Sequence, residues 1–368
     1  MKTEGKDDQR LYFILALSAI LLLIVFLIRS FHIDNGDRQI VIGGVFTGES
    51  TDNGWNESHA EGLKTACDEM NCQFLMKEQV AESESALRTA VGELIDAGCS
   101  AIFLTGQGYG AYSDALAASY PNTAFFCLSH KGEAKNCISY YVRHYQVRFL
   151  AGIVAGKASQ SGVVGYAAAM PDIQTKRGIN AFALGMRYAN PEAKLLVRFT
   201  GGFESEKKEK EAVKLLAEEG ADVITYHEDK PYAIEQAEEE GLFSIGFDAV
   251  YEEYSDRFLT ASLYDWDVVY SRLISDYLSG RANFSNGYKL GFSDTAVKLF
   301  PYSSLVSEET KELVGEGESR IFSTRDVFSG TIYDNQGVLR CGEDERISDY
   351  ELFTGMDWFV EGVEIYEQ

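Results

Sequence analysis

Residues 99–129 read CSAIFLTGQGYGAYSDALAASYPNTAFFCLS, and residues 221–248 read ADVITYHEDKPYAIEQAEEEGLFSIGFD. Both stretches contain, in the same order, an apolar run, a polar loop, a helical pattern and a second apolar run. A strand, a helix and a further strand in succession form the unit from which parallel sheets are built. Two similar stretches of this kind predict two similar α/β lobes, each with a parallel sheet.

The regions on either side continue this alternation. Apolar strand patterns occur at 39–46, 72–78, 163–169 and 193–203, and helical patterns separate them. We therefore predict an α/β fold of two Rossmann-like lobes, whose parallel sheets are joined by a hinge. The predicted organisation is 39–141 and 263–285 for lobe 1, 142–262 and 286–335 for lobe 2, and a C-terminal segment, 336–368, packed on the lobes.

A long apolar stretch lies near the N-terminus. Leu11–Ile28 contains no charged residue and is bounded by Arg10 and Arg29. As a helix it would be about 27 Å long, close to the roughly 30 Å of a bilayer core. Neither a small-residue cleavage site nor a cysteine follows it, which favours a transmembrane helix at 11–29 over a long signal peptide. We expect a cytoplasmic tail at 1–10, a single-pass anchor in the cell membrane and an extracytoplasmic body.

The chain is strongly acidic, with 33 Lys and Arg against 57 Asp and Glu and a net charge of −24. Such a surface repels phosphate backbones, which excludes a nucleic-acid partner. The sequence contains no nucleophile–base set, cofactor loop or metal-ligand spacing. We therefore expect no catalytic activity, no cofactor and no metal.

The six cysteines form no CxxC pair. Cys127 and Cys137 bracket a glycine-containing turn and are the best candidates for a disulfide. The alternative is that all six are small apolar packing residues.

In parallel α/β sheets, ligands bind beyond the carboxyl ends of the strands. The loop GQGYG (106–110) follows a strand but lacks the phosphate-loop pattern, so we expect a tight polar loop in which Gly106 and Tyr109 approach a ligand. His227 also ends a strand pattern, and it could donate a hydrogen bond to a ligand or lie in a solvated turn.

Three further residues follow strand patterns. Trp55 and Phe203 would come from opposite lobes and could clamp a planar ring between them. Asp248 could accept two hydroxyl hydrogen bonds from a polyol or a ribose. The alternatives are a hydrophobic staple for Trp55 and a helix N-cap for Asp248.

Several long segments together resemble one protein family. They are DNGWNESHAEG (52–62), YQVRFLAGIVAGKASQSGVVGYAAAMP (145–171), GINAFALGMRYANP (178–191), TGGFES (200–205) and GMDWFVEGVE (355–364). With these the chain resembles the basic membrane protein (BMP, Med-like) family of ABC-transporter substrate-binding proteins from about Gln39 to Tyr366. That family has the type I periplasmic binding protein fold, and its characterised members mostly bind nucleosides.

The resemblance implies roles for individual residues. Trp55 and Phe203 would sandwich the base, Asp52 and Asn56 would contact the ligand, and Asp248 would hold the ribose hydroxyls. The chain departs from the family pattern at three places, which leave the identity of the ligand open: Ser129 stands for an Asp, His227–Lys230 for a glycine-rich loop, and Tyr264 for a Lys.

We therefore expect a membrane-anchored, extracytoplasmic solute-binding protein of an ABC importer. It would close its two lobes around a small ligand, a nucleoside or a related purine, and deliver it to permease subunits. The alternative is a ligand-sensing ectodomain that signals to a membrane partner.

Overall fold

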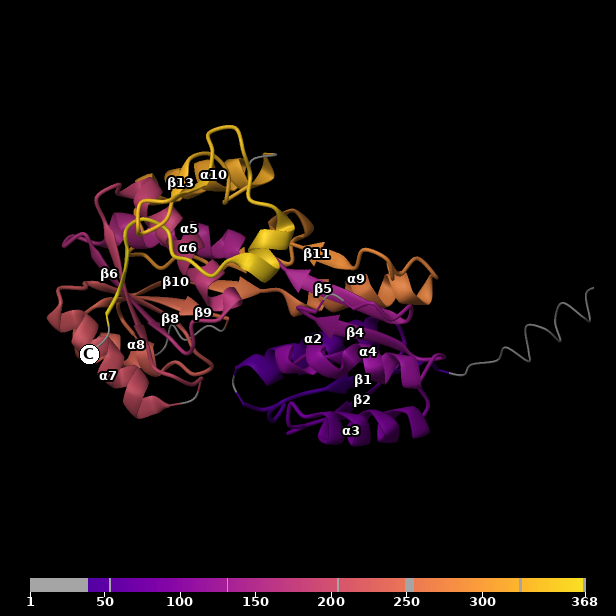
Figure 1. Cartoon of the computed structure of the whole chain (residues 1–368). Coiled ribbons are helices and arrows are strands. Elements are labelled where there is room, and N and C mark those ends of the chain that lie inside the picture. Colours follow the sequence, from indigo (N-terminus) through magenta and orange to yellow (C-terminus); the bar gives the residue numbers. More distant parts are fainter. Residues whose placement is uncertain are drawn as a thin grey trace, which may run out of the picture. The chain divides into compact units, whose positions relative to one another are not determined.

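The computed structural model describes residues 39–52, 54–130, 132–203, 205–248, 255–323 and 326–366 (Figure 1). The part from Val41 onward forms one compact unit. The predicted tail and anchor at 1–29 lie outside the described residues. Within the described ranges, no helix is both long enough and apolar enough to cross a membrane.

The first lobe is built on a six-stranded parallel sheet in the order β11-β5-β4-β3-β1-β2. Its strands are β1 (Val41–Val45), β2 (Gln73–Lys77), β3 (Cys99–Leu104), β4 (Ala124–Leu128), β5 (Cys137–Val142) and β11 (Tyr288–Leu290). Helices α2 (Trp55–Glu69) and α9 (Trp266–Leu278) pack on one face, and α3 (Glu84–Asp96) and α4 (Gly110–Ser119) pack on the other. Because both faces are covered, the central strands are almost wholly apolar.

The second lobe contains a seven-stranded sheet in the order β12-β10-β9-β8-β6-β7-β15. Its strands are β6 (Val163–Ala168), β7 (Lys194–Phe199), β8 (Val223–His227), β9 (Phe243–Phe247), β10 (Phe258–Tyr264), β12 (Val297–Leu299) and β15 (Val363–Ile365). Only β12 runs antiparallel to its neighbour among these strands. The expected α/β fold with two parallel sheets is thus confirmed.

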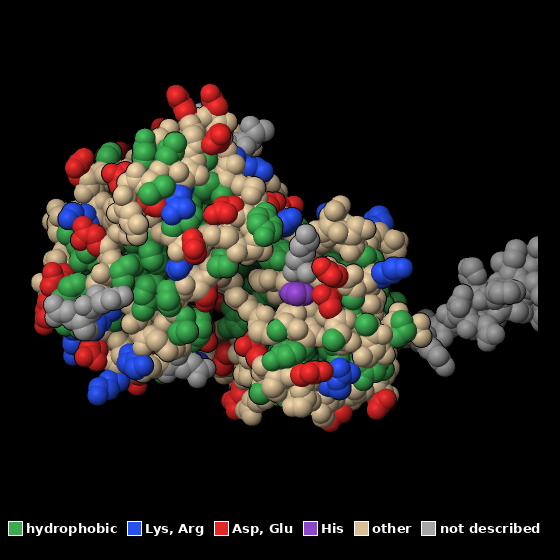
Figure 2. Space-filling model, viewed as in Figure 1, with side chains coloured by type: hydrophobic (Ala, Val, Ile, Leu, Met, Phe, Trp, Pro, Cys, Tyr) green, Lys and Arg blue, Asp and Glu red, His purple; other side chains and the backbone are tan. Residues whose placement is uncertain are grey.

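In the described part of the second lobe, five helices pack with the sheet or with one another. Helices α5 (Tyr145–Ala158) and α6 (Ile173–Ala189) share one apolar core, and α10 (Glu308–Phe322) contributes side chains to it. Helices α7 (Glu206–Glu218) and α8 (Tyr232–Glu239) pack on the opposite face. Over the surface seen in Figure 2, acidic side chains are spread across both lobes.

The chain passes between the lobes three times: from β5 to α5, from β10 to α9 and from β11 to β12. The third passage differs from the expected division, because β11 pairs with β5 in the first sheet although we assigned 286–335 to lobe 2. The C-terminal segment adds β15 to the edge of the second sheet and places Met356 and Trp358 in the core of that lobe. A short hairpin of β13 (Ile332–Tyr333) and β14 (Leu339–Cys341) precedes β15.

All six cysteines are free and buried, so the proposed disulfide between Cys127 and Cys137 is absent. In the parallel register, Cys127 lies opposite Ser139 and Cys137 lies opposite Phe125, so the two cysteines are not directly paired. Both belong to one apolar cluster. The alternative of small apolar packing residues therefore agrees with the structure. No group of side chains suited to a metal ion occurs in the described part of the chain.

Candidate functional site

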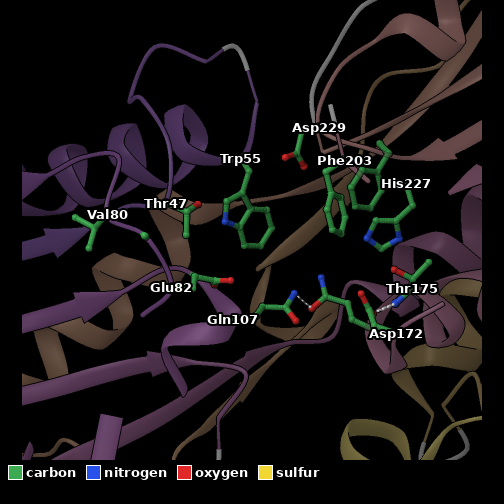
Figure 3. A pocket seen from close by; sticks show the side chains of 14 residues that line it. Thr47, Trp55, Val80, Glu82, Gln107, Asp172, Thr175, Phe203, His227 and Asp229 are labelled. Carbon is green, nitrogen blue, oxygen red and sulfur yellow. Dashed lines mark hydrogen bonds between the residues drawn. The ribbon is translucent and has the colours of Figure 1, made fainter. Parts of the chain in front are cut away.

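A pocket of about 470 Å³ lies between the two lobes, where the surface in Figure 2 is hollowed. Its walls come from strand ends and adjoining loops of both sheets (Figure 3). The first lobe supplies Thr47, Trp55, Val80, Ala81, Glu82, Gly106 and Gln107, and the second supplies Asp172, Gln174, Thr175, Phe203, His227, Asp229 and Phe247. Its volume is within the usual range for small-molecule sites.

Four of the nine predicted site residues line this pocket: Trp55, Gly106, Phe203 and His227. Figure 3 shows Trp55 and Phe203 on opposite sides of the gap, one from each lobe. The Phe203 side chain is 38% exposed, whereas the Trp55 ring also meets the Trp266 ring edge-to-face at 5.7 Å. Trp55 is therefore packed against its own lobe and also lines the pocket.

Asp52 and Asn56 do not line the pocket. The Asp52 carboxylate accepts hydrogen bonds from the backbone N–H groups of Gly54 (2.9 Å) and Glu57 (3.1 Å) at the start of α2. It also accepts one from Asn56 Nδ2 at 2.8 Å, while Asn56 Oδ1 accepts one from the Thr47 hydroxyl at 3.1 Å. These bonds order the loop that carries two pocket residues, so both side chains act here as positioning groups.

Tyr109 is also absent from the pocket wall. It is fully buried, and its hydroxyl donates a hydrogen bond to the carbonyl oxygen of Val80 at 2.6 Å. Burial and the nearby Glu82 carboxylate raise the pKa of Tyr109, so the phenol stays protonated and remains a donor. Tyr109 therefore fixes the segment of the first lobe that lines the pocket.

His227 ends β8 and its side chain is buried, at 6% exposure, so the solvated-turn alternative is wrong. Its Nδ1 has no hydrogen-bond partner in the described part of the chain. Burial, followed by the charges of Arg148 and Arg177, lowers the pKa of His227 to about 3. The imidazole is therefore neutral, with one nitrogen able to donate and the other able to accept.

Asp248 does not line the pocket but directly follows Phe247, the last residue of β9, which does, and it has a left-handed backbone (φ 61°). Its Oδ1 is buried and unpartnered among the described residues. Burial, then the charges of Asp229 and Asp52, raises the pKa of Asp248 to about 8. Residues 249–254 lie outside the described ranges, so its role as a helix cap stays a hypothesis.

Tyr264 does not line the pocket but belongs to a stack of rings behind it. It stacks on His144 at 4.1 Å and on Trp266 at 4.8 Å, and it meets the edge of Trp55 at 5.9 Å. Burial, followed by the Asp248 charge, raises the pKa of Tyr264. Tyr264 stands where the family resemblance suggests a lysine. Its ring instead supports Trp55 through aromatic packing.

The structure adds polar pocket residues that were not among the predicted site residues, although Gln107 belongs to the predicted GQGYG loop. Gln107 Nε2 donates to Gln174 Oε1 at 2.5 Å, which joins the two lobes at the floor of the pocket (Figure 3). Thr175 Oγ1 is buried without a partner in the described structure, and Glu82 belongs to the connection between β2 and α3. A search restricted to the first residues after each strand overlooks such positions, since helix starts and the far ends of loops also reach the pocket.

The pocket wall is acidic. Glu82, Asp172 and Asp229 line it, and no lysine or arginine does so among the described residues. Like charges in a concave, low-dielectric site repel each other strongly. This wall therefore disfavours a phosphorylated ligand and suits a neutral or cationic one with N–H and O–H donors.

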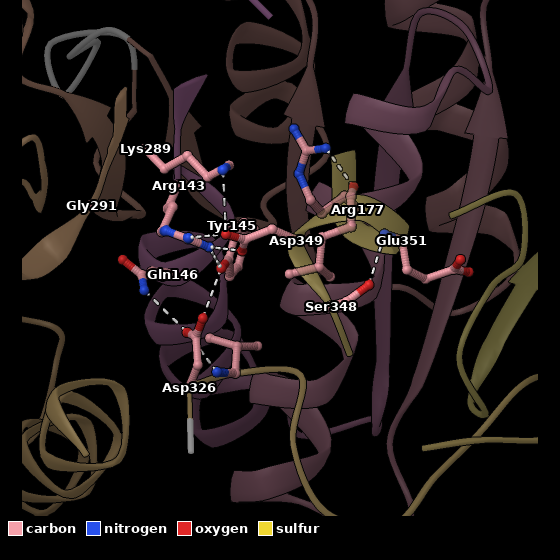
Figure 4. A network of polar contacts seen from close by, with 12 residues as sticks. Arg143, Tyr145, Gln146, Arg177, Lys289, Gly291, Asp326, Ser348, Asp349 and Glu351 are labelled. Carbon is pink, nitrogen blue, oxygen red and sulfur yellow. Dashed lines mark hydrogen bonds and ion pairs between the residues drawn. The ribbon is translucent and has the colours of Figure 1, made fainter. Parts of the chain in front are cut away.

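The passages between the lobes are bound to C-terminal residues (Figure 4). Arg143, directly after β5, forms a two-pronged ion pair with Asp349 at 2.8 and 2.9 Å. Asp326 accepts a hydrogen bond from Gln146 Nε2 at 3.0 Å, and Gln146 Oε1 accepts one from the Phe292 N–H at 2.8 Å. Two of the three passages are thus linked through one glutamine, which braces the region where a hinge would bend.

Known proteins resemble this chain over most of its length. A purine-binding protein of Brucella abortus (strain 2308) is 29% identical over 338 residues, which are 90% of this chain and 94% of that protein. A putative ABC transporter glucose-binding protein of Haloferax volcanii is 29% identical over 323 residues, which are 87% of this chain and 79% of that protein.

The fold also matches solved structures. One is the structure of a transcriptional activator of the comK gene from Bacillus halodurans, which superposes with a TM-score of 0.70 at 24% identity. The match covers 77% of this chain and 98% of that chain. The family model described as ABC transporter substrate-binding protein PnrA-like matches residues 39–328, which include the pocket and every strand of both sheets except β15. The resemblance noted in the sequence is thereby confirmed, and the chain belongs to the Bmp family of PnrA-like ABC transporter substrate-binding proteins.

Proposed function

We propose that this protein is the substrate-binding component of an ABC importer and binds a nucleoside or a related purine in the pocket between its lobes. One observation carries the proposal: Trp55 and Phe203 lie on opposite walls of one pocket and come from different lobes. A flat ring bound between them would contact both lobes at once. Binding would then favour the closed arrangement, since a ligand stabilises the state in which it makes more contacts.

Unpartnered polar atoms around the pocket supply the remaining recognition. The buried atoms His227 Nδ1, Thr175 Oγ1 and Asp248 Oδ1 have no partners among the described residues. An unpaired buried polar group is costly, so a ligand that pairs with it gains affinity. We assign the vicinal hydroxyls of a ribose to Asp248 and a hydrogen bond from the ligand to His227.

The energies of these contacts suit a receptor. Base–aromatic stacking contributes about 1–3 kcal/mol per ring, and a hydrogen bond to a charged group contributes about 1.5–3 kcal/mol. Two of each sum to about 5–12 kcal/mol, from which association subtracts about 4 kcal/mol or more, so we expect a dissociation constant no tighter than about micromolar.

The relatives point to two ligand classes, of which we favour the purine. Aromatic walls on both sides fit a planar base, and the absence of lysine and arginine from the described lining fits an unphosphorylated one. The test is calorimetry of the full chain in detergent with adenosine, guanosine, inosine, adenine and glucose. We expect micromolar binding of at least one purine and none of glucose; failure of every purine to bind would contradict the proposal.

We further propose that residues 11–29 anchor the protein in the cell membrane, with its body on the extracytoplasmic side next to the permease. The uncharged stretch Leu11–Ile28 supports this placement. A sensory ectodomain would use the same pocket but a different partner. Co-purification from crosslinked membranes separates the two: a permease subunit supports transport, and a membrane kinase or cyclase supports sensing.

A further inference from the structure

The glycine-rich loop after β3 holds a carboxylate. The backbone N–H of Gly108 donates a hydrogen bond to Glu82 Oε1 at 2.6 Å. A Cβ atom on Gly106 would lie 2.8 Å from the same oxygen, and a Cβ on Gly108 would overlap the carboxylate. Gly106 and Gly108 of the GQGYG loop therefore provide space for the Glu82 head group, which gives this motif a function other than phosphate binding.

The backbone that carries Glu82 is also fixed. Val80 donates its N–H to the Phe46 carbonyl at 2.9 Å and accepts the Tyr109 hydroxyl at 2.6 Å. Tyr109 is fully buried, so this anchor point is rigid. The chain is thus anchored two residues before Glu82, and one carboxylate oxygen of Glu82 is held by Gly108, although the side chain lies at the surface of the pocket.

The remaining carboxylate oxygen is available to a ligand. Glu82 lines the pocket together with Trp55 and Gln107, and Figure 3 shows its carboxylate beside the Trp55 ring, directed toward the same gap. Among the described residues, no lysine, arginine or histidine forms an ion pair with it. A carboxylate can accept about four hydrogen bonds, so the bond from Gly108 leaves capacity for donors on the edge of a ring stacked on Trp55.

We propose that Glu82 determines ligand specificity by accepting hydrogen bonds from an exocyclic amine of the base stacked on Trp55. This inference rests on the proposed function and adds to it: the pocket would prefer amino-purines to purines without the amine. The main alternative is structural, with Glu82 only capping the helical turn η1 (Gln107–Tyr109). If Glu82 acted only as a cap, its substitution would lower the stability of the protein and would weaken the binding of all ligands equally.

Pairs of ligands that differ by one amine distinguish these roles. Adenosine and purine riboside differ at the 6-amino group, and guanosine and inosine differ at the 2-amino group. All four are titrated calorimetrically into the full chain in detergent, as wild type, Glu82→Gln and Glu82→Ala. In Glu82→Gln the amide oxygen can keep the Gly108 bond, which turns the NH₂ donors toward the amine of the base. Glu93→Gln is the matched control, because Glu93 pairs with Lys77 at the surface of α3, outside the pocket.

In at least one pair, wild type should bind the amine-bearing member about tenfold more tightly, as expected for one charge-assisted hydrogen bond. Both Glu82 variants should reduce that preference to less than about threefold, and Glu93→Gln should retain it. The inference is overturned if wild type shows no preference in either pair, if the preference survives in the Glu82 variants, or if both members weaken equally. Failure of wild type to bind any of the four purines would instead overturn the proposed function, and the inference with it.

Discussion

The ammonium group of Lys230 in the second lobe donates a hydrogen bond to the backbone carbonyl oxygen of Asp52 in the first lobe. The two segments are close enough that a Cβ on Gly54 would lie 2.6 Å from the carbonyl oxygen of Asp229. The bond between Gln107 and Gln174 is a second contact between the lobes. One contact therefore lies in the loop that carries Trp55, and the other lies at the floor of the pocket. These contacts favour the closed arrangement that we assign to the ligand-bound protein.

Lys230→Ala should weaken ligand binding about threefold to tenfold. The variant loses one hydrogen bond between the lobes, whose net contribution is about 0.5–1.5 kcal/mol, and the binding-competent closed state becomes less populated. Stopped-flow measurement should show mainly a faster dissociation rate. Lys207→Ala, on the exposed surface of α7, is the control and should bind like wild type. An unchanged dissociation rate in Lys230→Ala would show that the contact plays no part in closure.

Phe203→Ala should lower ligand affinity by about 1–3 kcal/mol, the contribution of one stacked ring. Because Phe203 is 38% exposed, the melting temperature of the protein should change little. Trp55→Ala should lose as much affinity but should also destabilise the protein, since its ring packs against Trp266 in the first lobe and Tyr264 at the end of β10. Thermal denaturation and calorimetry on both variants check this difference. If Phe203→Ala bound with wild-type affinity, the clamp hypothesis would be wrong.

Ligand affinity should rise with pH between about 6 and 8. The pKa of Asp248 is raised to about 8, so the carboxyl is mainly protonated at neutral pH, whereas we expect the ligand hydroxyls to require the carboxylate. Binding then releases a proton, and affinity increases up to tenfold per pH unit below the pKa. His227 is neutral throughout this range, because its pKa is about 3. Calorimetry in two buffers with different ionisation enthalpies measures the proton released.

Asp248→Asn provides the control for that titration. Above the Asp248 pKa of about 8, the substitution should cost at least about 1.5 kcal/mol of affinity, because a charged acceptor is lost and an amide donor faces a hydroxyl donor. The loss should be larger for a ribonucleoside than for its 2′-deoxy analogue. The variant should also show no proton release, although Glu228, whose pKa is raised to about 9, remains in the same region. A variant that keeps both affinity and pH dependence would leave Asp248 with a structural role only.

The protein should lose stability as pH rises from about 4.5 to 8. Glu209 is fully buried, and burial followed by the charges of Asp229, Glu206 and Glu235 raises its pKa to about 8. In this range the folded state holds a proton that the unfolded state has released, so the free energy of unfolding decreases with increasing pH. Glu209→Met should reduce the fall in melting temperature between pH 5 and pH 8. Glu211→Met, at an exposed position of the same helix, should leave it unchanged, and equal behaviour of the two variants would refute the assignment.

The mature protein should retain its N-terminal 29 residues. The apolar stretch Leu11–Ile28 has no small-residue cleavage site or lipid-attachment cysteine after it, so we expect an anchor that is not removed. Intact mass spectrometry of the protein extracted from membranes checks this. A chain that begins after residue 30 would show that the stretch is a signal peptide.

Part of the site could be predicted because it follows from the order of elements. Parallel strands place their carboxyl ends at one edge of a sheet, and this rule selected the loops that contain Trp55, Gly106, Phe203 and His227, which line the pocket, but also Asp52, Asn56 and Asp248, which do not. The same rule was too coarse for Tyr109, which also follows β3 but points into the protein core. The rule specifies the edge of the sheet but not the direction of each side chain.

The sequence by itself determined the two α/β lobes, because the alternation of apolar strands and amphipathic helices is a local property of the chain. Only the tertiary structure decided that β11 joins the first sheet, that Asp52 turns back onto the start of α2, and that Glu82 lies against Gly108. Each of these depends on contacts between segments far apart in the sequence or on the exact turn of a loop. Periodicity carries no information about such contacts, since they arise when separate elements pack together and their polar groups find partners.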